Sequence, residues 1–321
     1  MQIKQREYKC SREQKWGAKV KRLSMKKLWK RNWQLFILLL PAVIYLFLFN
    51  YKPMYGVQIA FRNFSPKKGI WGSDWVGIEY FLKFVKQPNF RMLIKNTLII
   101  GVYNLATFPC PIIFALLLNE LRNQKFKKTV QMISYMPYFL STVVVCSMIS
   151  LFFKDETGIF NLIIKALGGE SQDFMTIPEY FADIYVWSGE WQSLGFSAII
   201  YIAGLAGVPS ELLDAAKIDG AGKIKIIWYV NIPWIMPTIV IMLILKCGGI
   251  LSVGFEKIFL LQNSLNLSAS QVISTYVYEI GMKGGQFSYS TAIGLFNNII
   301  SVIMLAIVNG IAKKTTGNGV W

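Results

Sequence analysis

Histidine is absent from this chain of 321 residues, and acidic residues are scarce, with 17 Asp and Glu against 34 Lys and Arg. Without histidine the chain cannot build a Ser-His-Asp triad, a histidine-ligated zinc site or a histidine proton relay. The cysteines are few and have neither metal-ligand spacing nor a disulfide-framework pattern, so we interpret them as small buried hydrophobic residues. They are Cys10, Cys110, Cys146 and Cys247. No catalytic residue and no metal site is therefore predicted.

A phosphate-binding loop is also missing. Gly249 and Gly254 have the separation that such a loop needs, but Phe255 and Glu256 follow where Lys and Ser or Thr are required. We therefore expect that this chain does not itself bind ATP by that route.

Apolar sequence is in excess. The chain is 54% hydrophobic and 16% charged, with a mean hydropathy of +0.42, whereas soluble domains average about 45–50% apolar and about 25% charged. The excess is concentrated in runs of roughly 20 residues, the length that a helix needs to cross a hydrocarbon core of about 30 Å. We predict an all-α membrane protein with six transmembrane helices, at about 33–51, 93–119, 129–153, 184–206, 234–258 and 289–312.

Several of these runs contain proline, which is typical of spanning helices that kink inside a bundle. The prolines concerned are Pro41, Pro109, Pro111, Pro137 and Pro237.

Basic residues indicate the orientation. With a cytoplasmic N-terminus, the inner segments hold 21 Lys and Arg and the longer outer segments hold 10. The positive-inside rule therefore predicts that both termini are cytoplasmic. The external loop 51–92 opposes this pattern, because it carries seven basic residues against Asp74 and Glu79. Its prolines and glycines favour a small folded external element.

The N-terminal segment 1–32 carries twelve Lys and Arg. It is too long and too basic for the start of a signal peptide, and no small-residue cleavage site follows, so we expect the first span to be retained. The segment could bind nucleic acid or lie on an anionic lipid surface. Because it adjoins a predicted span, we expect membrane lipid as its partner and no nucleic acid. The predicted organisation is this basic cytoplasmic tail, a six-span membrane domain at 33–312 and a short cytoplasmic tail at 313–321.

A polar segment at 207–232 separates the fourth run from the fifth, and the orientation places it in the cytoplasm. Ser210 is the predicted N-cap of a short helix, and Glu211 lies in its first turn, where the helix dipole favours an acid. Ala215 and Ala216 continue the helix. Their small side chains would let another surface approach closely.

Gly220 permits the positive φ that a sharp turn requires. A second short helix, lying at the membrane interface, is predicted at 224–230, and Pro233 is expected to open the fifth span. An amphipathic linker resting on lipid headgroups is the alternative interpretation, and physical arguments alone identify no partner.

The residues of this segment form a known pattern, namely Asp214-Ala215-Ala216, then Asp219-Gly220-Ala221, then Val230-Asn231-Ile232-Pro233. It resembles the EAA loop of ABC-importer permeases, in which Glu-Ala-Ala, three residues, Gly and nine residues precede Ile-x-Leu-Pro. Asp214 replaces the usual Glu and keeps its charge. The resemblance runs from about residue 33 to the end. Segments 50–61, 71–77 and 317–321 are similar to the polysaccharide or oligosaccharide permease subgroup of the carbohydrate (maltose-type) family.

This resemblance implies a permease subunit, without enzymatic activity, of an ATP-driven ABC importer for oligosaccharides or polysaccharide fragments in a bacterial cell membrane. The implied partners are a second homologous permease forming a heterodimer, two ATPase subunits that hold ATP and Mg²⁺, an extracellular solute-binding protein and the carbohydrate substrate. The residues that would couple the permease to the ATPases are Glu211, Asp214, Ala215, Ala216, Asp219, Gly220, Ala221 and Pro233.

In maltose-type permeases the helices on either side of the coupling loop line the substrate cavity. A sugar site needs aromatic faces and hydrogen-bonding side chains beside water. By resemblance, the candidates here are Trp191, Gln192, Ser193, Phe196 and Lys246. An interfacial aromatic belt is the alternative for Trp191.

Lys246 lies inside an apolar run, where a lysine costs about 2.5–3.5 kcal/mol, so it should face a cavity or a carboxylate. Glu256 and Lys257, near the outer end of the same run, are expected to be solvated.

Two other classes compete with this interpretation. A secondary transporter or channel without ATP coupling is disfavoured by the lack of repeated halves, the few intramembrane carboxylates and the absent histidine. A membrane glycosyltransferase would rest on the lone acidic pair Asp155-Glu156, which is too weak a pattern.

Overall fold

The computed structural model describes residues 25–317 and residue 319. The predicted N-terminal tail at 1–32 and the C-terminal motif at 317–321 therefore lie partly outside the described residues. The chain divides into two compact units, Met1–Val57 and Gln58–Trp321.

The first unit contains one apolar rod, formed by α2 (Met25–Leu46), a π-helical turn η1 (Phe47–Tyr51) and α3 (Lys52–Met54). Pro41 lies inside α2 and does not end it. Large apolar side chains are exposed around the rod, among them Leu38, Ile44 and Phe49. A helix that is apolar on all sides is suited to lipid or to packing against another membrane helix.

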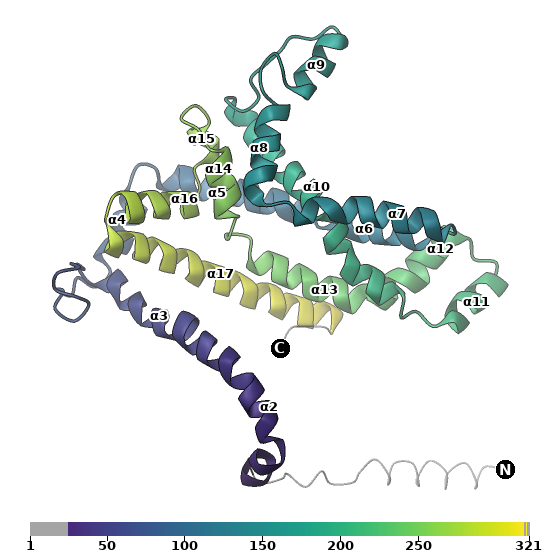
Figure 1. Ribbon diagram of the computed structural model, residues 1–321, viewed down its shortest axis with the longest axis horizontal. Helices are drawn as coiled ribbons and strands as arrows, with labels where there is room; N and C mark the ends of the chain where they lie inside the picture. The colour runs from purple at the N-terminus through teal and green to yellow at the C-terminus, as the bar shows by residue number, and fades with distance from the viewer. Residues whose placement is uncertain (1–24, 318, 320–321) are drawn as a thin grey trace. The chain divides into compact units, whose positions relative to one another are not determined.

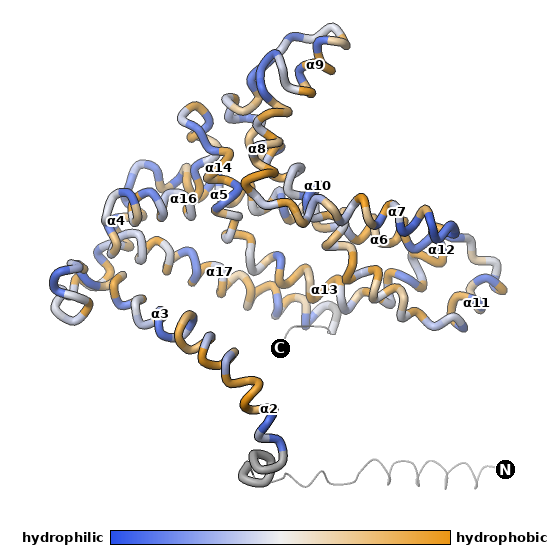
Figure 2. Tube along the Cα trace, in the orientation of Figure 1, coloured by the Kyte–Doolittle hydropathy of each residue, from blue (hydrophilic) through white to orange (hydrophobic). Residues whose placement is uncertain are grey.

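The second unit is helical throughout its described part, with two isolated β-bridges and no sheet (Figure 1). Four candidate spans are long and apolar enough to cross a membrane, and six result if each of two bent helix pairs is one span. Orange, apolar residues dominate the long helices in Figure 2. The predicted all-α, six-span architecture is confirmed. The four candidates are Asn32–Phe61, Phe90–Asn119, Lys223–Gly248 and Phe287–Thr315.

The second and third runs are interrupted helices. α5 (Phe90–Ala106) gives way to α6 (Pro109–Asn119), which begins at a proline because proline lacks the N–H that the helix interior needs. α7 (Gln124–Tyr135) and the 3₁₀ turn η3 (Met136–Phe139) meet α8 (Thr142–Phe152) at an angle of 100°. Pro137 predicted a kink here, and the bend is much sharper than a proline kink because the helix stops and restarts.

α10 (Pro178–Leu205) is a long helix of 28 residues with no proline after its first turn. Its apolar residues Ala198, Tyr201 and Leu205 pack against Ala115 and Leu116 of α6. The pair α10 and α11 (Ser210–Ile218) is bent by 78° across a short break.

α10 also lies very close to α7. A Cβ atom added at Gly195 would overlap the main-chain carbonyl of Ser134, so only glycine allows this approach.

The fifth run differs from its predicted bounds. α12 (Lys223–Ile226), η4 (Ile227–Asn231) and α13 (Ile232–Gly248) form one continuous helix. The separate interfacial helix predicted at 224–230 is therefore wrong, and the span does not begin at Pro233. It also ends at Gly248 instead of continuing to residue 258. The chain turns there because Ile250 packs against Gly101 of α5, where a Cβ atom would overlap the Ile250 carbonyl.

Several short elements lie at the end where α17 begins. α4 (Glu79–Lys86), α16 (Ile273–Tyr278) and the start of α17 (Phe287–Thr316) share a core with Phe84, Ile273 and Tyr289. The other short elements are η2 (Tyr55–Phe61), α9 (Ile159–Ala166), α14 (Phe255–Leu261), α15 (Leu267–Ser270) and η5 (Glu279–Lys283).

A buried asparagine organises the loop around α9. The Asn161 side chain is fully buried, donates to the Lys154 carbonyl (3.0 Å) and the Gln172 carbonyl (2.8 Å), and accepts from the Gln172 N–H (3.0 Å). At the loop's start, the Asp155 carboxylate accepts hydrogen bonds from the Ser171 hydroxyl and the Glu156 N–H. These hydrogen bonds fix both ends of the loop.

Candidate coupling loop and cavities

The predicted coupling residues lie at one extreme end of the second unit, on and beside α11 (Figure 1). Pro209 has the non-helical cap conformation, with φ −60° and ψ 132°, and Ser210 is the first helical residue, without a side-chain cap. The prediction that Ser210 is the N-cap is therefore wrong. Pro209, one residue earlier, has the non-helical backbone of the cap position. Glu211 does lie in the first turn.

Gly220 ends this helix with a left-handed turn. Its φ is +75°, its N–H donates to the Lys217 carbonyl (3.0 Å), and the Ala221 N–H donates to the Ala216 carbonyl (2.9 Å). No atom lies within 4 Å of the position that a Cβ atom of residue 220 would take. The positive φ predicted for Gly220 is present, and backbone conformation alone accounts for glycine at this position.

α11 buries none of its residues. Ile218 is 87% exposed, and Leu212, Ile224 and Trp228 are exposed beside it. Ala216 and Ala221 are half-buried, whereas Glu211, Asp214, Ala215, Asp219 and Pro233 are exposed. Within the described part of the chain, the Asp214 carboxylate forms an ion pair only with Lys217 of its own helix, at 3.0 Å. An exposed helix with apolar and acidic side chains at the end of a bundle is a surface suited to a partner.

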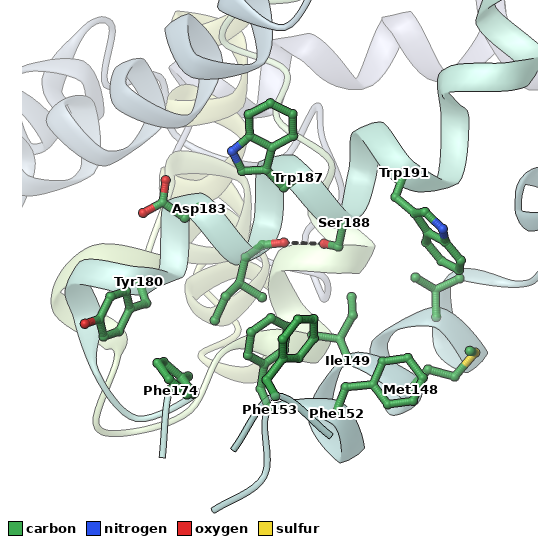
Figure 3. A pocket seen from close by; sticks show the side chains of 13 residues that line it. Met148, Ile149, Phe152, Phe153, Phe174, Tyr180, Asp183, Trp187, Ser188 and Trp191 are labelled. Carbon is green, nitrogen blue, oxygen red and sulfur yellow. Dashed lines mark hydrogen bonds between the residues drawn. The ribbon is translucent and has the colours of Figure 1, made fainter. Parts of the chain in front are cut away.

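A cavity of about 590 Å³ opens between α8 and the first half of α10. Figure 3 shows phenylalanine side chains gathered along it, with Trp191 at one edge. Its lining residues are Val145, Met148, Ile149, Phe152, Phe153, Phe160, Phe174, Tyr180, Asp183, Ile184, Trp187, Ser188 and Trp191.

Three polar residues of this cavity, Asp183, Trp187 and Ser188, have hydrogen-bond partners within the chain. The Asp183 carboxylate accepts from the Tyr103 hydroxyl (2.6 Å), and the same hydroxyl accepts from the Trp187 indole N–H (2.9 Å). The Ser188 hydroxyl donates to the Ile184 carbonyl (Figure 3). The cavity therefore offers mainly apolar and aromatic surface.

The structure does not bring the five predicted pathway residues into one site. Trp191 lines the large cavity. Gln192 donates to the Leu140 carbonyl (3.1 Å) at the bend before α8, and Ser193 donates to the Gly189 carbonyl (2.8 Å) of its own helix. Phe196 stacks on the Tyr138 ring at 3.8 Å. Three of the five thus make packing or hydrogen-bonding contacts within α10 and around the bend.

Lys246 lines a second cavity of about 270 Å³, together with Asn104 and Ser252. Its ammonium lies 5.8 Å from the Phe108 ring and interacts electrostatically with Glu190 of α10. The expectation that Lys246 faces a cavity or a carboxylate fits both of these surroundings.

Sequence reasoning missed Lys257, whose predicted solvation is wrong. Lys257 is 8% exposed, donates to the Tyr185 carbonyl (2.9 Å) and lies 5.0 Å from the Tyr185 ring. Gly189 leaves room for the ammonium, which would lie 3.2 Å from a Cβ atom there. The turn after α13 carries α14 against α10, and no local pattern pairs residues 72 positions apart. Glu256 is exposed.

An all-helical membrane bundle that ends in an exposed, acidic helix-and-turn of this pattern defines the class of transport permeases. Comparison with known proteins agrees. Residues 109–317 match the family described as binding-protein-dependent transport system inner membrane component. The chain belongs to this family.

Relatives extend the match to most of the chain. It is 42% identical over 288 residues to the polygalacturonan/rhamnogalacturonan transport system permease protein YteP of Bacillus subtilis (strain 168), covering 89% of this chain and 90% of that protein. It is 41% identical over 293 residues to protein LplB of the same organism, covering 91% and 92%.

Solved structures share the fold. The crystal structure of a bacterial ABC transporter involved in the import of the acidic polysaccharide alginate superposes with a TM-score of 0.83 at 35% identity, covering 91% of this chain and 99% of that one. A second alginate ABC transporter structure, in complex with an alginate pentasaccharide-bound periplasmic protein, gives a TM-score of 0.84 at 35% identity and covers 92% and 99%. The chain is a multi-pass inner-membrane permease subunit of an ABC importer, and the competing secondary-transporter interpretation is set aside.

Proposed function

We propose that this permease imports oligosaccharides cut from an acidic, uronate-containing polysaccharide, and that α11 couples the transport cycle to ATP hydrolysis in two separate ATPase subunits. The observation that carries the coupling is α11, which buries none of its residues, with its left-handed turn at Gly220. This chain binds no ATP itself in the proposal, and ATP and Mg²⁺ are held by the ATPases.

Charge supports an acidic cargo. YteP is named for polygalacturonan and rhamnogalacturonan, and the similar solved transporter is described for the acidic polysaccharide alginate. In this chain the half-buried Lys246 lines a cavity inside the bundle, and a cation within an apolar run is stabilised by an anion close to it. The basic excess of the external loop 51–92 would likewise attract a polyanion.

The proposed orientation has both termini and the coupling loop 207–232 in the cytoplasm and the loop 51–92 outside. In this arrangement a second, homologous permease completes the membrane dimer, and an extracellular solute-binding protein delivers the saccharide. Glu211, Asp214, Ala216, Asp219 and Ala221 present the surface that the ATPase receives. The exposed Ile218 and Leu212 supply apolar area to the same contact.

The proposed pathway uses two of the predicted residues directly. Trp191 offers a ring face at the edge of the large cavity, and Lys246 offers a charge in the smaller one. Gln192, Ser193 and Phe196 support α10 and the neighbouring bend from behind, through their contacts with Leu140, Gly189 and Tyr138.

Uptake by a strain that lacks the chromosomal copy tests the substrate class. We expect import of radiolabelled trigalacturonate with the intact gene, at least tenfold less import in the deletion strain, and recovery on complementation. Methyl-esterified trigalacturonate, which has the same rings without their charge, serves as the matched control. Equal import of both sugars, or equal import by the deletion strain, would refute the acidic cargo. Failure of ATPase subunits to co-purify in detergent would refute the coupling.

A further inference from the structure

The external part of the second unit contains a small folded loop, residues 61–77, that neither the coupling nor the pathway uses. Bridges join Arg62 to Trp75 and Ser65 to Gly69. The Asn63 N–H donates to the Asp74 carbonyl (2.8 Å), and the Val76 N–H donates to the Phe61 carbonyl (2.9 Å). The loop is therefore an ordered element with a defined surface.

Side chains hold this loop together and fix it to the bundle. The Ser73 hydroxyl donates to the Gly69 carbonyl (2.6 Å) and accepts from the Ser65 N–H (3.1 Å). The Phe64 N–H donates to the Ser288 hydroxyl (2.8 Å) at the start of α17, and the Phe64 ring contacts Phe287 edge-on at 6.3 Å. Whatever the loop binds is thus held in a constant position on the bundle.

Two tryptophans and an arginine form one cluster on this loop. The Arg62 guanidinium carbon lies 5.6 Å from the Trp71 ring and 5.5 Å from the Trp75 ring. Its Nη1 donates to the Ser73 carbonyl (2.9 Å), whereas its buried Nε has no hydrogen-bond partner. Trp75 is stacked on Phe61 at 5.7 Å. The cluster is ordered before any ligand arrives, so binding would lose little side-chain entropy.

The tryptophans nevertheless remain open to solvent. Trp71 is 71% exposed and Trp75 is 63% exposed. A loop that needed these rings only for folding would bury them, because burial of aromatic area is what stabilises a fold. Exposed indoles beside a guanidinium match a charged sugar, since the ring faces pack on the apolar C–H face of a pyranose and the guanidinium pairs with a carboxylate.

The basic residues around the cluster also favour an anionic ligand. Lys67 and Lys68 lie on the same loop, and Lys68 is only distantly paired with Asp74, at 3.9 Å. Basic residues outside the membrane oppose the orientation rule that the rest of the chain follows. An anionic ligand on the outer face gives these residues a function. The loop contacts the start of α17, whereas α11 lies at the opposite end of the second unit (Figure 1).

We propose that Arg62, Trp71 and Trp75 form an external subsite for a uronate ring of an acidic oligosaccharide. The tryptophan rings contact the faces of the sugar and the Arg62 guanidinium binds its carboxylate, so that the cargo is held at the outer face before it reaches the cavities. This inference rests on the proposed import of acidic saccharides.

Binding to the purified full-length permease in nanodiscs of zwitterionic phosphatidylcholine tests the subsite. The probe is trigalacturonate, measured by calorimetry and by saturation-transfer NMR, with methyl-esterified trigalacturonate as the uncharged match. We expect Trp71→Ala and Arg62→Gln each to weaken trigalacturonate binding by about tenfold, the factor that about 1.4 kcal/mol of lost contact gives. Trp71→Phe should retain most of the affinity, and Lys125→Gln on α7 should leave it unchanged.

Three results would overturn the subsite. They are equal affinity of the acidic and esterified sugars, unchanged affinity in Trp71→Ala, and loss of affinity in Lys125→Gln as large as in Arg62→Gln. Arg62 also supports the loop, so the Arg62→Gln result is used only if the variant has the same thermal midpoint in detergent as the wild type. If the midpoint is lower, the Trp71→Ala result alone decides, because the Trp71 side chain is exposed.

Lipid phosphate is a second anion that this cluster could contact. If addition of phosphatidylglycerol to the nanodisc protects Trp71 from oxidation while trigalacturonate does not, the cluster is a lipid anchor and the proposal is wrong. The proposed function is tested apart from this. A strain that imports trigalacturonate normally with Trp71→Ala refutes the subsite alone, whereas a wild-type strain that imports no trigalacturonate refutes the function even where the purified protein binds it.

Discussion

Two glycines of the coupling loop allow a test of backbone conformation with almost nothing else changed. Gly220 has φ +75° and Gly222 has φ −70°, and neither has an atom within 4 Å of its Cβ position. Alanine at either position therefore adds a methyl group in open space. Only at position 220 must the new alanine also adopt a left-handed backbone conformation, which L-residues disfavour.

The expected magnitude follows from this difference. A left-handed conformation costs an L-residue about 1–2 kcal/mol, so Gly220→Ala should lower the equilibrium constant for forming the turn by roughly 5- to 30-fold. Gly222→Ala should change it by less than about 1 kcal/mol, because its φ suits alanine. Gly220→Asn should lie between them, since asparagine tolerates the left-handed region better than other residues.

Reconstitution of the complete transporter in proteoliposomes provides the assay. We expect Gly220→Ala to weaken the apparent affinity of the permease for its ATPase by the same 5- to 30-fold, with import falling in parallel, whereas Gly222→Ala behaves as wild type. If the two alanine variants give equal affinities, the left-handed turn does not set the docking surface and the reasoning fails.

Three further predictions concern packing and the loop around α9. Asn161→Ala should expose that loop to proteolysis, because three buried hydrogen bonds of about 1 kcal/mol each are lost, and unchanged cleavage would contradict this. Gly195→Ala should lower the thermal midpoint of unfolding, because steric overlap with α7 destabilises the fold by about 1–3 kcal/mol. Gly294→Ala in α17 adds its methyl group in open space and should leave the midpoint unchanged. Equal midpoints for the two variants would refute the close approach of α10 to α7. The Ser171 hydroxyl holds the pKa of Asp155 below its ordinary value, so its contribution is present above about pH 4 and is lost as pH falls through the lowered pKa. Hydrogen exchange of the loop amides should therefore accelerate only in that acidic range, and acceleration at neutral pH would contradict the assignment.

Much of the architecture could be predicted because it depends on local sequence. Six apolar runs of spanning length, the short helix with Glu211 in its first turn and the positive φ of Gly220 all follow from residues close together in the chain. The end of the fifth helix could not be predicted. It coincides with the close approach of Ile250 to Gly101, and apolar residues such as Leu251 and Val253 continue past that point.

Part of the candidate site could likewise be predicted from local sequence, and part could not. The proposed coupling residues are close together in sequence, so a local pattern is enough to group them. The surroundings of the pathway residues depend on distant contacts, such as Gln192 with the Leu140 carbonyl, and Lys257 is buried only because α14 returns to α10. A single sequence contains no local feature that reports such contacts. The Ser210 cap prediction failed for a different, local reason, because the adjacent Pro209 supplies the non-helical cap backbone one residue earlier.

The uninterrupted α10 has a mechanical consequence. Its 28 residues form a rod about 42 Å long, with Tyr180 near one end and α11 beyond the other. Because no proline interrupts the rod after its first turn, a tilt of about 5° about Gly195 moves the Tyr180 end, about 22 Å away, by roughly 2 Å. Gly195 lies between the two, where α10 touches α7, and is placed to act as the fulcrum. Under the proposed coupling, a substitution at Gly195 would change how far the Tyr180 end of α10 moves when the α11 end tilts.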